Sequence, residues 1–137
     1  MEFNLDLLFQ KSDLIPVIIQ DADTLEVLML GFTNREAVEL TIKTKTAWFW
    51  SRSRQKLWNK GESSGHYLHV REMRTDCDTD TLLYLCQPDG PTCHTGSRSC
   101  FFRGYYSSKS LLNSSADTSL TSSSTCSFNQ PASFSST

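Results

Sequence analysis

The chain has 137 residues and a net charge of −2 at pH 7, with an isoelectric point of about 5.9. This length suits one domain with its own core, and the slight acidity argues against general attraction to nucleic acid or anionic membranes. No apolar run approaches the roughly 20 residues that cross a bilayer, and residues 1–6 lack the basic and apolar regions of a secretory signal. We therefore expect a cytoplasmic protein whose five cysteines are free thiols or metal ligands rather than disulfides.

The first third of the chain predicts a short helix followed by a hairpin. Residues 3–9 have the mixed apolar and polar pattern of a short helix. Residues 14–20 and 25–30 are rich in branched apolar side chains and predict two strands, joined by a turn at residues 21–24. Gly31 is expected to end the second strand.

A helix and three more strands follow. Thr33 and Glu36 form a capping box, so the helix is expected to begin there and to end near Thr44. The bulky or alternating segments that predict strands are residues 48–50, 67–73 and 79–87. The last segment is apolar on both faces and is therefore expected to be a central strand. Together these elements predict an α+β fold with a largely antiparallel sheet and few short helices.

The composition changes sharply after Gly104. From Ser107 onward, serine and threonine dominate and only Lys109 and Asp117 are charged. Such a segment buries too little apolar surface to offset the entropy of ordering it. We expect a domain at residues 1–104 and a disordered Ser/Thr-rich tail at residues 105–137.

Three aspartates alternate with other residues at Asp76, Asp78 and Asp80. On a strand they would share one face, with Cys77 on the other, but the outer two would lie roughly 13 Å apart. Two carboxylates can share a magnesium ion directly, and the third needs a bend or a bridging water. The alternative is a turn of solvated acids. The glycine and glutamate that an EF-hand requires are missing, which excludes that motif.

Three cysteines, Cys77, Cys93 and Cys100, surround the same region. They do not form CxxC pairs, so a zinc ribbon or finger is not expected. Three thiolates with an open fourth position are typical of catalytic zinc, whereas the alternative is free thiols, which fits Cys86 in the middle of a strand. An extended strand between them would leave Cys93 roughly 20 Å or more from Cys77. One zinc ion is therefore easier to complete across a dimer interface than within one chain.

Residues 51–66 combine basic, aromatic, hydroxyl and glycine residues. Arg52 and Arg54 can form paired hydrogen bonds with phosphate, Trp58 can stack on a base, and Gly61 and Gly65 allow backbone N–H groups to approach anions. The pattern favours a loop that binds a phosphorylated small molecule. Single-stranded RNA is the alternative ligand.

Four segments, residues 51–54, 58–66, 76–80 and 93–101, occur in an order that closely resembles the phosphoribosyl-AMP cyclohydrolase family of histidine biosynthesis. The resemblance covers residues 14–104. It implies an intertwined homodimer that binds zinc through Cys77, Cys93 and Cys100, shared between subunits. It also implies magnesium bound by the three aspartates, Asp76, Asp78 and Asp80.

The implied reaction is hydrolytic opening of the purine ring of N1-(5-phosphoribosyl)-AMP at the C6–N1 bond. His94, beside Cys93, is the first candidate for the general base, with His66 and His69 behind it. The residues expected to bind substrate are Arg52, Arg54 and Lys60 for the phosphates, Trp58 for the base, Glu62 and Ser64 for the riboses or a water, and Gly61 and Gly65 in the loop backbone.

The sequence leaves two alternative functions open. One is a zinc-stabilised module that binds single-stranded RNA through residues 48–60, although the net acidity argues against it. The other is a metal-bound interaction domain without catalysis. A steep salt dependence of RNA affinity would support the first, and an unchanged function after substitution of His94 would support the second.

Overall fold

The computed structural model describes residues 4–108. The predicted tail therefore lies mostly outside the described residues. The chain up to Cys100 forms one structural unit, and the part from Phe101 onward belongs to another. The helices and strands of residues 4–108, and all candidate site residues, lie in the first unit.

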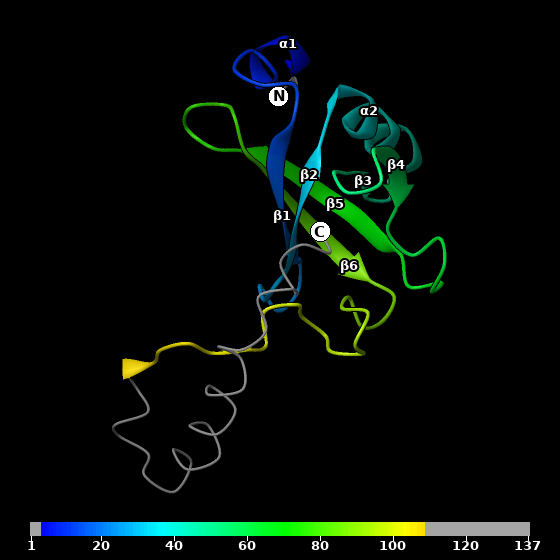
Figure 1. Ribbon diagram of the computed structural model, residues 1–137, viewed down its shortest axis with the longest axis vertical. Coiled ribbons are helices and arrows are strands. Elements are labelled where there is room, and N and C mark those ends of the chain that lie inside the picture. The colour runs from blue at the N-terminus through cyan, green and yellow to red at the C-terminus, as the bar shows by residue number, and fades with distance from the viewer. Residues whose placement is uncertain (1–3, 109–137) are drawn as a thin grey trace, which may run out of the picture. The chain divides into compact units, whose positions relative to one another are not determined.

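A four-stranded sheet forms the centre of this unit, in the order β2-β1-β6-β5 (Figure 1). The strands are β1 (Ile15–Asp21), β2 (Val27–Thr33), β5 (Leu68–Thr75) and β6 (Leu82–Pro88). The β1–β2 and β5–β6 pairs are antiparallel, but β1 and β6 run parallel, with Asp21 opposite Cys86. The α+β class is confirmed, and the sheet, predicted to be largely antiparallel, is mixed because β1 and β6 pair in parallel.

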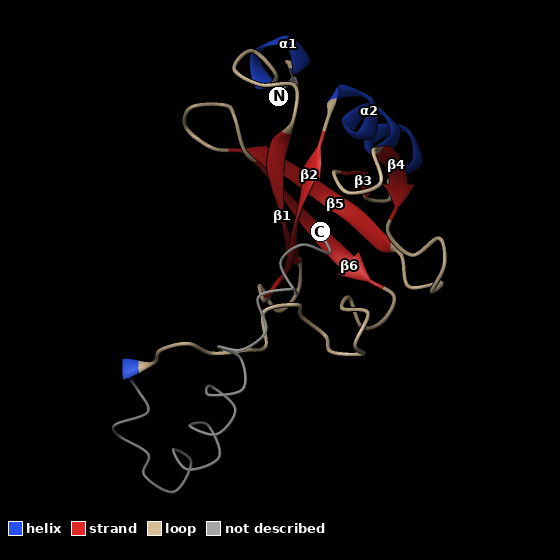
Figure 2. Cartoon of the chain, viewed as in Figure 1, coloured by secondary structure: helices blue, strands red, loops and turns tan. Residues whose placement is uncertain are grey.

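In Figure 2 the remaining elements lie at the upper end of the sheet and on its right-hand side. Helix α1 (Leu5–Leu8) is a single turn, and α2 (Arg35–Thr44) follows β2 directly. Strands β3 (Trp48–Ser51) and β4 (Lys56–Asn59) form a separate antiparallel hairpin. The sequence pattern predicted β3 but missed β4, because the basic and polar residues around β4 resemble a loop.

Three local predictions were wrong. Gly31 lies inside β2, where a Cβ atom would approach the Phe49 ring to 2.7 Å, so glycine is required by packing rather than by strand termination. Asn34 rather than Thr33 caps α2, and its side chain accepts the Ala37 N–H at 2.9 Å. The last predicted strand begins at Leu82, because residues 77–79 form a turn.

The core lies between the sheet and the β3 hairpin. Val17, Ile19, Phe49, Leu82 and Tyr84 are fully buried in it. β6 is central, as predicted, and is flanked by β1 and β5. No helix among residues 4–108 is long and apolar enough to span a membrane.

Candidate metal centres and substrate loop

The three aspartates lie in a tight turn between β5 and β6. Asp76 organises this turn, because its Oδ1 accepts the Asp80 N–H at 3.0 Å and the Thr81 N–H at 3.2 Å. Thr79 adopts a positive φ of 58°, which reverses the chain. One carboxylate oxygen from each of Asp76, Asp78 and Asp80 lies within 4.8 Å of the others. The bend thus removes the 13 Å separation that a straight strand would impose, and the three hard oxygen donors suit a magnesium-type ion.

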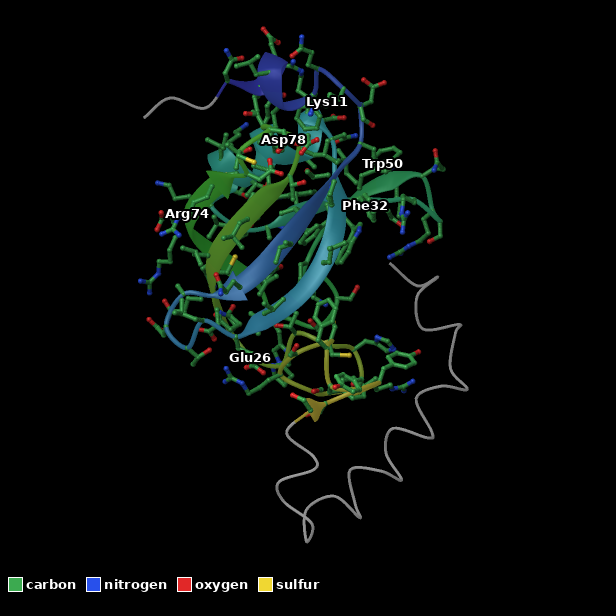
Figure 3. All side chains as sticks on the ribbon, turned by 90° about the vertical axis from the view of Figure 1, so that its left-hand side faces the viewer. Lys11, Glu26, Phe32, Trp50, Arg74 and Asp78 are labelled. Atoms are coloured by element: carbon green, nitrogen blue, oxygen red, sulfur yellow. The ribbon has the colours of Figure 1, made fainter. Side chains whose placement is uncertain are left out.

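Lys11 also contacts this acidic turn. Its Nζ lies 3.2 Å from an Asp80 oxygen and 3.8 Å from an Asp78 oxygen. The hydrogen bond to Asp80, together with the charges of all three aspartates, raises the pKa of Lys11 despite some opposing desolvation. Figure 3 shows Lys11 and Asp78 close together at one end of the sheet. An ammonium group therefore neutralises part of the charge that would bind a cation.

Cys77 belongs to the same turn. Its thiol donates a hydrogen bond to Asp78 Oδ1 at 3.0 Å, and this bond with the Asp78 and Asp76 charges raises the pKa of Cys77. The prediction that Cys77 and the aspartates point to opposite faces was therefore wrong. That prediction assumed an extended strand, and a turn does not alternate its side chains.

Cys93 and Cys100 form a pair of thiols in the loop that follows β6. Their side chains are close enough for each to affect the pKa of the other. Burial tends to raise the pKa of Cys93, but the hydrogen bond from Thr95 (Oγ1 to Sγ, 3.1 Å), the neighbouring Cys100 and the charge of Lys60 lower it overall. Burial and the neighbouring Cys93 raise the pKa of Cys100 to about 11. The Cys93 thiol is therefore the more acidic of the two. By contrast, burial raises the pKa of Cys86 to about 12, which fits the free-thiol interpretation.

The thiol pair and Cys77 lie at opposite ends of the sheet. Because β1 and β6 are parallel, their C-terminal ends lie at the same end of the sheet, and Cys93 and Cys100 come after β6 at that end. Cys77 comes before β6, at the opposite end of the sheet. The seven residues of β6 therefore separate Cys77 from the other two cysteines, a distance of roughly 20 Å. Among the described residues, only the three aspartates gather as a group of at least three metal ligands. One chain therefore does not bring the three cysteines together.

The predicted substrate loop, residues 51–66, spans the β3–β4 turn, β4 and the connection from β4 to β5. Gly61 (φ 103°) and Gly65 (φ 82°) both adopt conformations that favour glycine, and the Gly65 N–H bonds to the Gly61 carbonyl at 2.7 Å. Lys60 is half-buried, its ammonium lies 5.8 Å from the Trp58 ring, and it is close enough to Cys93 and Cys100 to interact with their charges.

Other predicted substrate residues already have partners within the chain. Trp58 packs on Phe49 with ring centroids 5.1 Å apart, and Arg52 lies over the Phe32 ring at 3.9 Å. Glu62 accepts the Asn59 N–H at 2.9 Å, and Ser64 accepts the His66 N–H at 3.2 Å. Arg54 is exposed in the β3–β4 turn, where its N–H bonds to Ser51 Oγ at 3.2 Å.

The candidate histidines differ in their surroundings. His69 Nε2 lies 2.9 and 3.0 Å from the two oxygens of Asp89, and a carboxylate in this position fixes the ring orientation. The His66 ring faces Gly90, where an added Cβ would lie 3.0 Å from it. His94 is exposed beside Cys93. All three lie near the C-terminal end of β6, because Leu68 pairs with Pro88.

Comparison with known proteins shows which family the sequence belongs to. Residues 29–102 match the family model described as phosphoribosyl-AMP cyclohydrolase. The chain belongs to the phosphoribosyl-AMP cyclohydrolase family. It is 61% identical over 93 residues to the phosphoribosyl-AMP cyclohydrolase of Methanocella arvoryzae, covering 68% of this chain and 78% of that protein. It is 56% identical over 97 residues to that of Nitrosopumilus maritimus, covering 70% and 90% of the two chains.

The same domain occurs in larger proteins. A histidine biosynthesis bifunctional protein of Lactococcus lactis is 56% identical over 94 residues, which cover 69% of this chain and 44% of that protein. Phosphoribosyl-AMP cyclohydrolases are hydrolases of histidine biosynthesis, and this membership favours an enzyme over the RNA-binding and non-catalytic alternatives.

Sequence reasoning missed several residues that contact the candidate sites or lie beside them. Lys11 is distant in sequence from the aspartates that it contacts, so no spacing pattern indicates it. The sequence did not single out Asp89, although its carboxylate pairs with His69. Asp21 and Arg98 form an ion pair across the base of the cysteine loop. Arg98 lies between Cys93 and Cys100 in the sequence. This position was the one sequence feature that could have indicated that Arg98 lies beside the cysteines.

The two loop glycines provide a matched test of the cyclohydrolase loop geometry. A Cβ at Gly61 would lie 2.7 Å from backbone atoms of His66 and Tyr67, whereas a Cβ at Gly65 would meet nothing within 4 Å. We expect Gly65→Ala to cost about 1–2 kcal/mol for its positive φ alone. Gly61→Ala should cost about 1–3 kcal/mol more because of the clash. Urea unfolding of both variants measures the difference, and equal losses would contradict the close packing of this loop.

Proposed function

We propose that this chain is a metal-dependent hydrolase that opens the purine ring of N1-(5-phosphoribosyl)-AMP at the C6–N1 bond, as its family membership implies. The observation that carries the proposal is the pair of neighbouring thiols of Cys93 and Cys100, which lies within the matched residues 29–102, close to Lys60 and next to His94 in the sequence. Thiolates of this kind suit zinc. The product would be the phosphoribosyl-formimino-AICAR nucleotide.

The proposed zinc ligands are Cys93 and Cys100 of one subunit and Cys77 of the partner subunit in a homodimer. Two observations support this division. Cys93 and Cys100 would provide two of the four ligands of a tetrahedral zinc ion, and Cys77 lies beyond the opposite end of β6. Three protein ligands would leave one position for water, which is the arrangement of catalytic rather than structural zinc. The partner subunit would make the enzyme an obligate dimer.

The proposed magnesium ligands are Asp76, Asp78 and Asp80, whose oxygen atoms lie within 4.8 Å of one another. Carboxylate oxygens at this spacing fit a hard divalent cation. Because Cys77 contacts Asp78, the two metal sites would be neighbours rather than independent sites. Substitution of Asp78 would then affect both.

In the proposed reaction, water adds at C6 and the C6–N1 bond breaks, so that C6 becomes the carboxamide carbon. Bound zinc would lower the pKa of water and supply hydroxide near neutral pH. His94 is the proposed base that takes a proton from the water and returns it to N1. Arg52, Arg54 and Lys60 would bind the phosphates. The further substrate contacts would come from Trp58, Gly61, Glu62, Ser64 and Gly65, and His66 and His69 remain alternative bases.

The activity is tested directly by incubating purified protein with phosphoribosyl-AMP and following the absorbance change as the ring opens. We expect saturable turnover that a zinc chelator abolishes and that added zinc restores. Magnesium should raise turnover further. Absence of turnover in zinc-loaded, dimeric protein would contradict the proposed function.

Lys11 is expected to compete with the divalent cation at the acidic turn. Its ammonium lies 3.2 Å from Asp80, so a bound cation must displace it or tolerate its repulsion. We expect Lys11→Met to raise Mg²⁺ affinity several-fold at low ionic strength, and the gain should shrink at high salt as the charge is screened. Isothermal titration with Mg²⁺ alone measures this, with Lys43→Met on α2 as a charge-matched control. Equal affinities in the two variants would show that Lys11 does not compete.

A further inference from the structure

The cysteine loop is held in place by backbone contacts and by one charged anchor. Residues 92–100 contain no strand or helix. Within the loop, the Thr92 N–H bonds to the Arg98 carbonyl at 3.2 Å and the Cys93 N–H bonds to the Ser97 carbonyl at 3.1 Å. These two bonds place Cys93 opposite the Arg98 segment. Any displacement of Arg98 would therefore move Cys93.

The far end of the loop is attached to β2. The Ser99 hydroxyl donates to the Val27 carbonyl at 2.7 Å, and the Cys100 N–H bonds to the Leu28 carbonyl at 2.8 Å. Cys100 is therefore aligned along the edge of the sheet. These two hydrogen bonds hold the end of the loop along β2. They do not attach the centre of the loop to the sheet.

Arg98 supplies that attachment. Its guanidinium donates to Glu26 Oε1 at 3.0 Å and to Asp21 Oδ2 at 3.4 Å. Asp21 ends β1 and Glu26 precedes β2, so one side chain links the loop to both sides of the hairpin. Glu26 marks the end of the sheet opposite Lys11 and Asp78 in Figure 3. Because both carboxylates contact it, Arg98 is directed toward the β1–β2 hairpin.

Asp21 is a rigid partner for this contact. Only 5% of its surface is exposed. Its Oδ1 accepts the Asp23 N–H at 2.8 Å and the Thr24 N–H at 3.0 Å, which leaves Oδ2 for Arg98. Burial raises the pKa of Asp21, but these hydrogen bonds and Arg98 lower it overall, so the carboxylate is charged. A buried charge without a partner is costly, and the guanidinium is therefore held at a defined position.

We propose that the Asp21–Arg98 ion pair positions Cys93 and Cys100 for metal binding, so that Asp21 and Arg98 are positioning residues of the zinc site. The inference rests on the proposed function, because it takes the two thiols to be zinc ligands. Residues that orient metal ligands without touching the metal typically change metal affinity 10- to 100-fold when they are replaced. We expect about the lower end of that range, since neither residue bonds directly to a sulfur.

The test measures zinc affinity of the full-length protein by competition with a chromophoric chelator, together with the absorption spectrum of the cobalt-loaded protein. Arg98→Met should weaken zinc binding about tenfold and alter the cobalt bands, because the two sulfurs lose their fixed spacing. Asp21→Asn should do the same, since the amide oxygen still accepts the Asp23 and Thr24 N–H groups but no longer attracts Arg98. Arg98→Lys should recover part of the affinity, because it keeps the charge but loses the planar fork.

Arg35→Met is the matched control, because it removes another arginine–aspartate pair, Arg35–Asp6 at 2.6 Å, far from the cysteines in sequence. Unchanged zinc affinity and cobalt spectra in Arg98→Met and Asp21→Asn, even with a lower melting temperature, would overturn the inference and leave the proposed function intact. If Arg98→Met does not fold, the same comparison is decided by Asp21→Asn and Arg98→Lys. Failure of the wild-type protein to bind zinc would overturn the proposed zinc site as well.

Discussion

Cys93→Ala is expected to remove both zinc and activity. Cys93 is buried, accepts a hydrogen bond from Thr95 and neighbours Cys100, so its loss removes one proposed zinc ligand and a group beside the second. Two remaining ligands cannot complete a tetrahedral site. If zinc supplies several kcal/mol of transition-state stabilisation, turnover should fall by roughly a thousandfold or more. Metal analysis and the phosphoribosyl-AMP assay on the same preparation measure both effects.

Cys86→Ala is the matched control for this experiment. Cys86 is a buried thiol in the middle of β6, and burial, together with the charge of Asp21, raises its pKa, so it is not a proposed ligand. Its replacement should lower stability by about 1 kcal/mol, through a small loss of packing, and should leave zinc content unchanged. A full zinc complement in folded Cys93→Ala would contradict the ligand assignment.

The second large effect is complementation between two inactive variants. If zinc is bound by Cys93 and Cys100 of one subunit and Cys77 of the partner subunit, Cys77→Ala and Cys93→Ala are each inactive as homodimers. In a mixed dimer, one site takes Cys77 from the Cys93 variant and Cys93 from the Cys77 variant, so that site is intact. Random pairing makes half of the dimers mixed, with one of two sites working, so the expected ceiling is about a quarter of wild-type turnover.

The experiment distinguishes the two arrangements because a site within one chain cannot be repaired by mixing. Every such site would carry one defect, whichever chains pair. The variants are refolded together, dimers are isolated by size, and turnover is compared with each variant refolded alone. Zero recovery in confirmed mixed dimers would support a site within one chain and would contradict the separation of Cys77 from the thiol pair by β6.

The sequence by itself determined the family and most of the elements. Four short motifs in a fixed order were enough to indicate phosphoribosyl-AMP cyclohydrolase, and the match over residues 29–102 agrees. Strands such as β1 and β6 were predictable because alternation or continuous apolarity reflects how each strand is buried. These are local properties, so neighbouring residues are sufficient to reveal them.

The tertiary structure decided which residues from distant parts of the sequence lie close together. The parallel pairing of β1 and β6 depends on contacts between segments about 65 residues apart, and no local pattern specifies strand direction. It places Asp21 beside the cysteine loop and Cys77 at the far end of the sheet. The turn at Asp76 likewise replaced the expected strand, because the Asp76 carboxylate bonds to backbone N–H groups and Thr79 takes a left-handed conformation. Ligand types can be identified from residue chemistry, whereas their grouping depends on hydrogen bonds and packing that form only when distant segments meet.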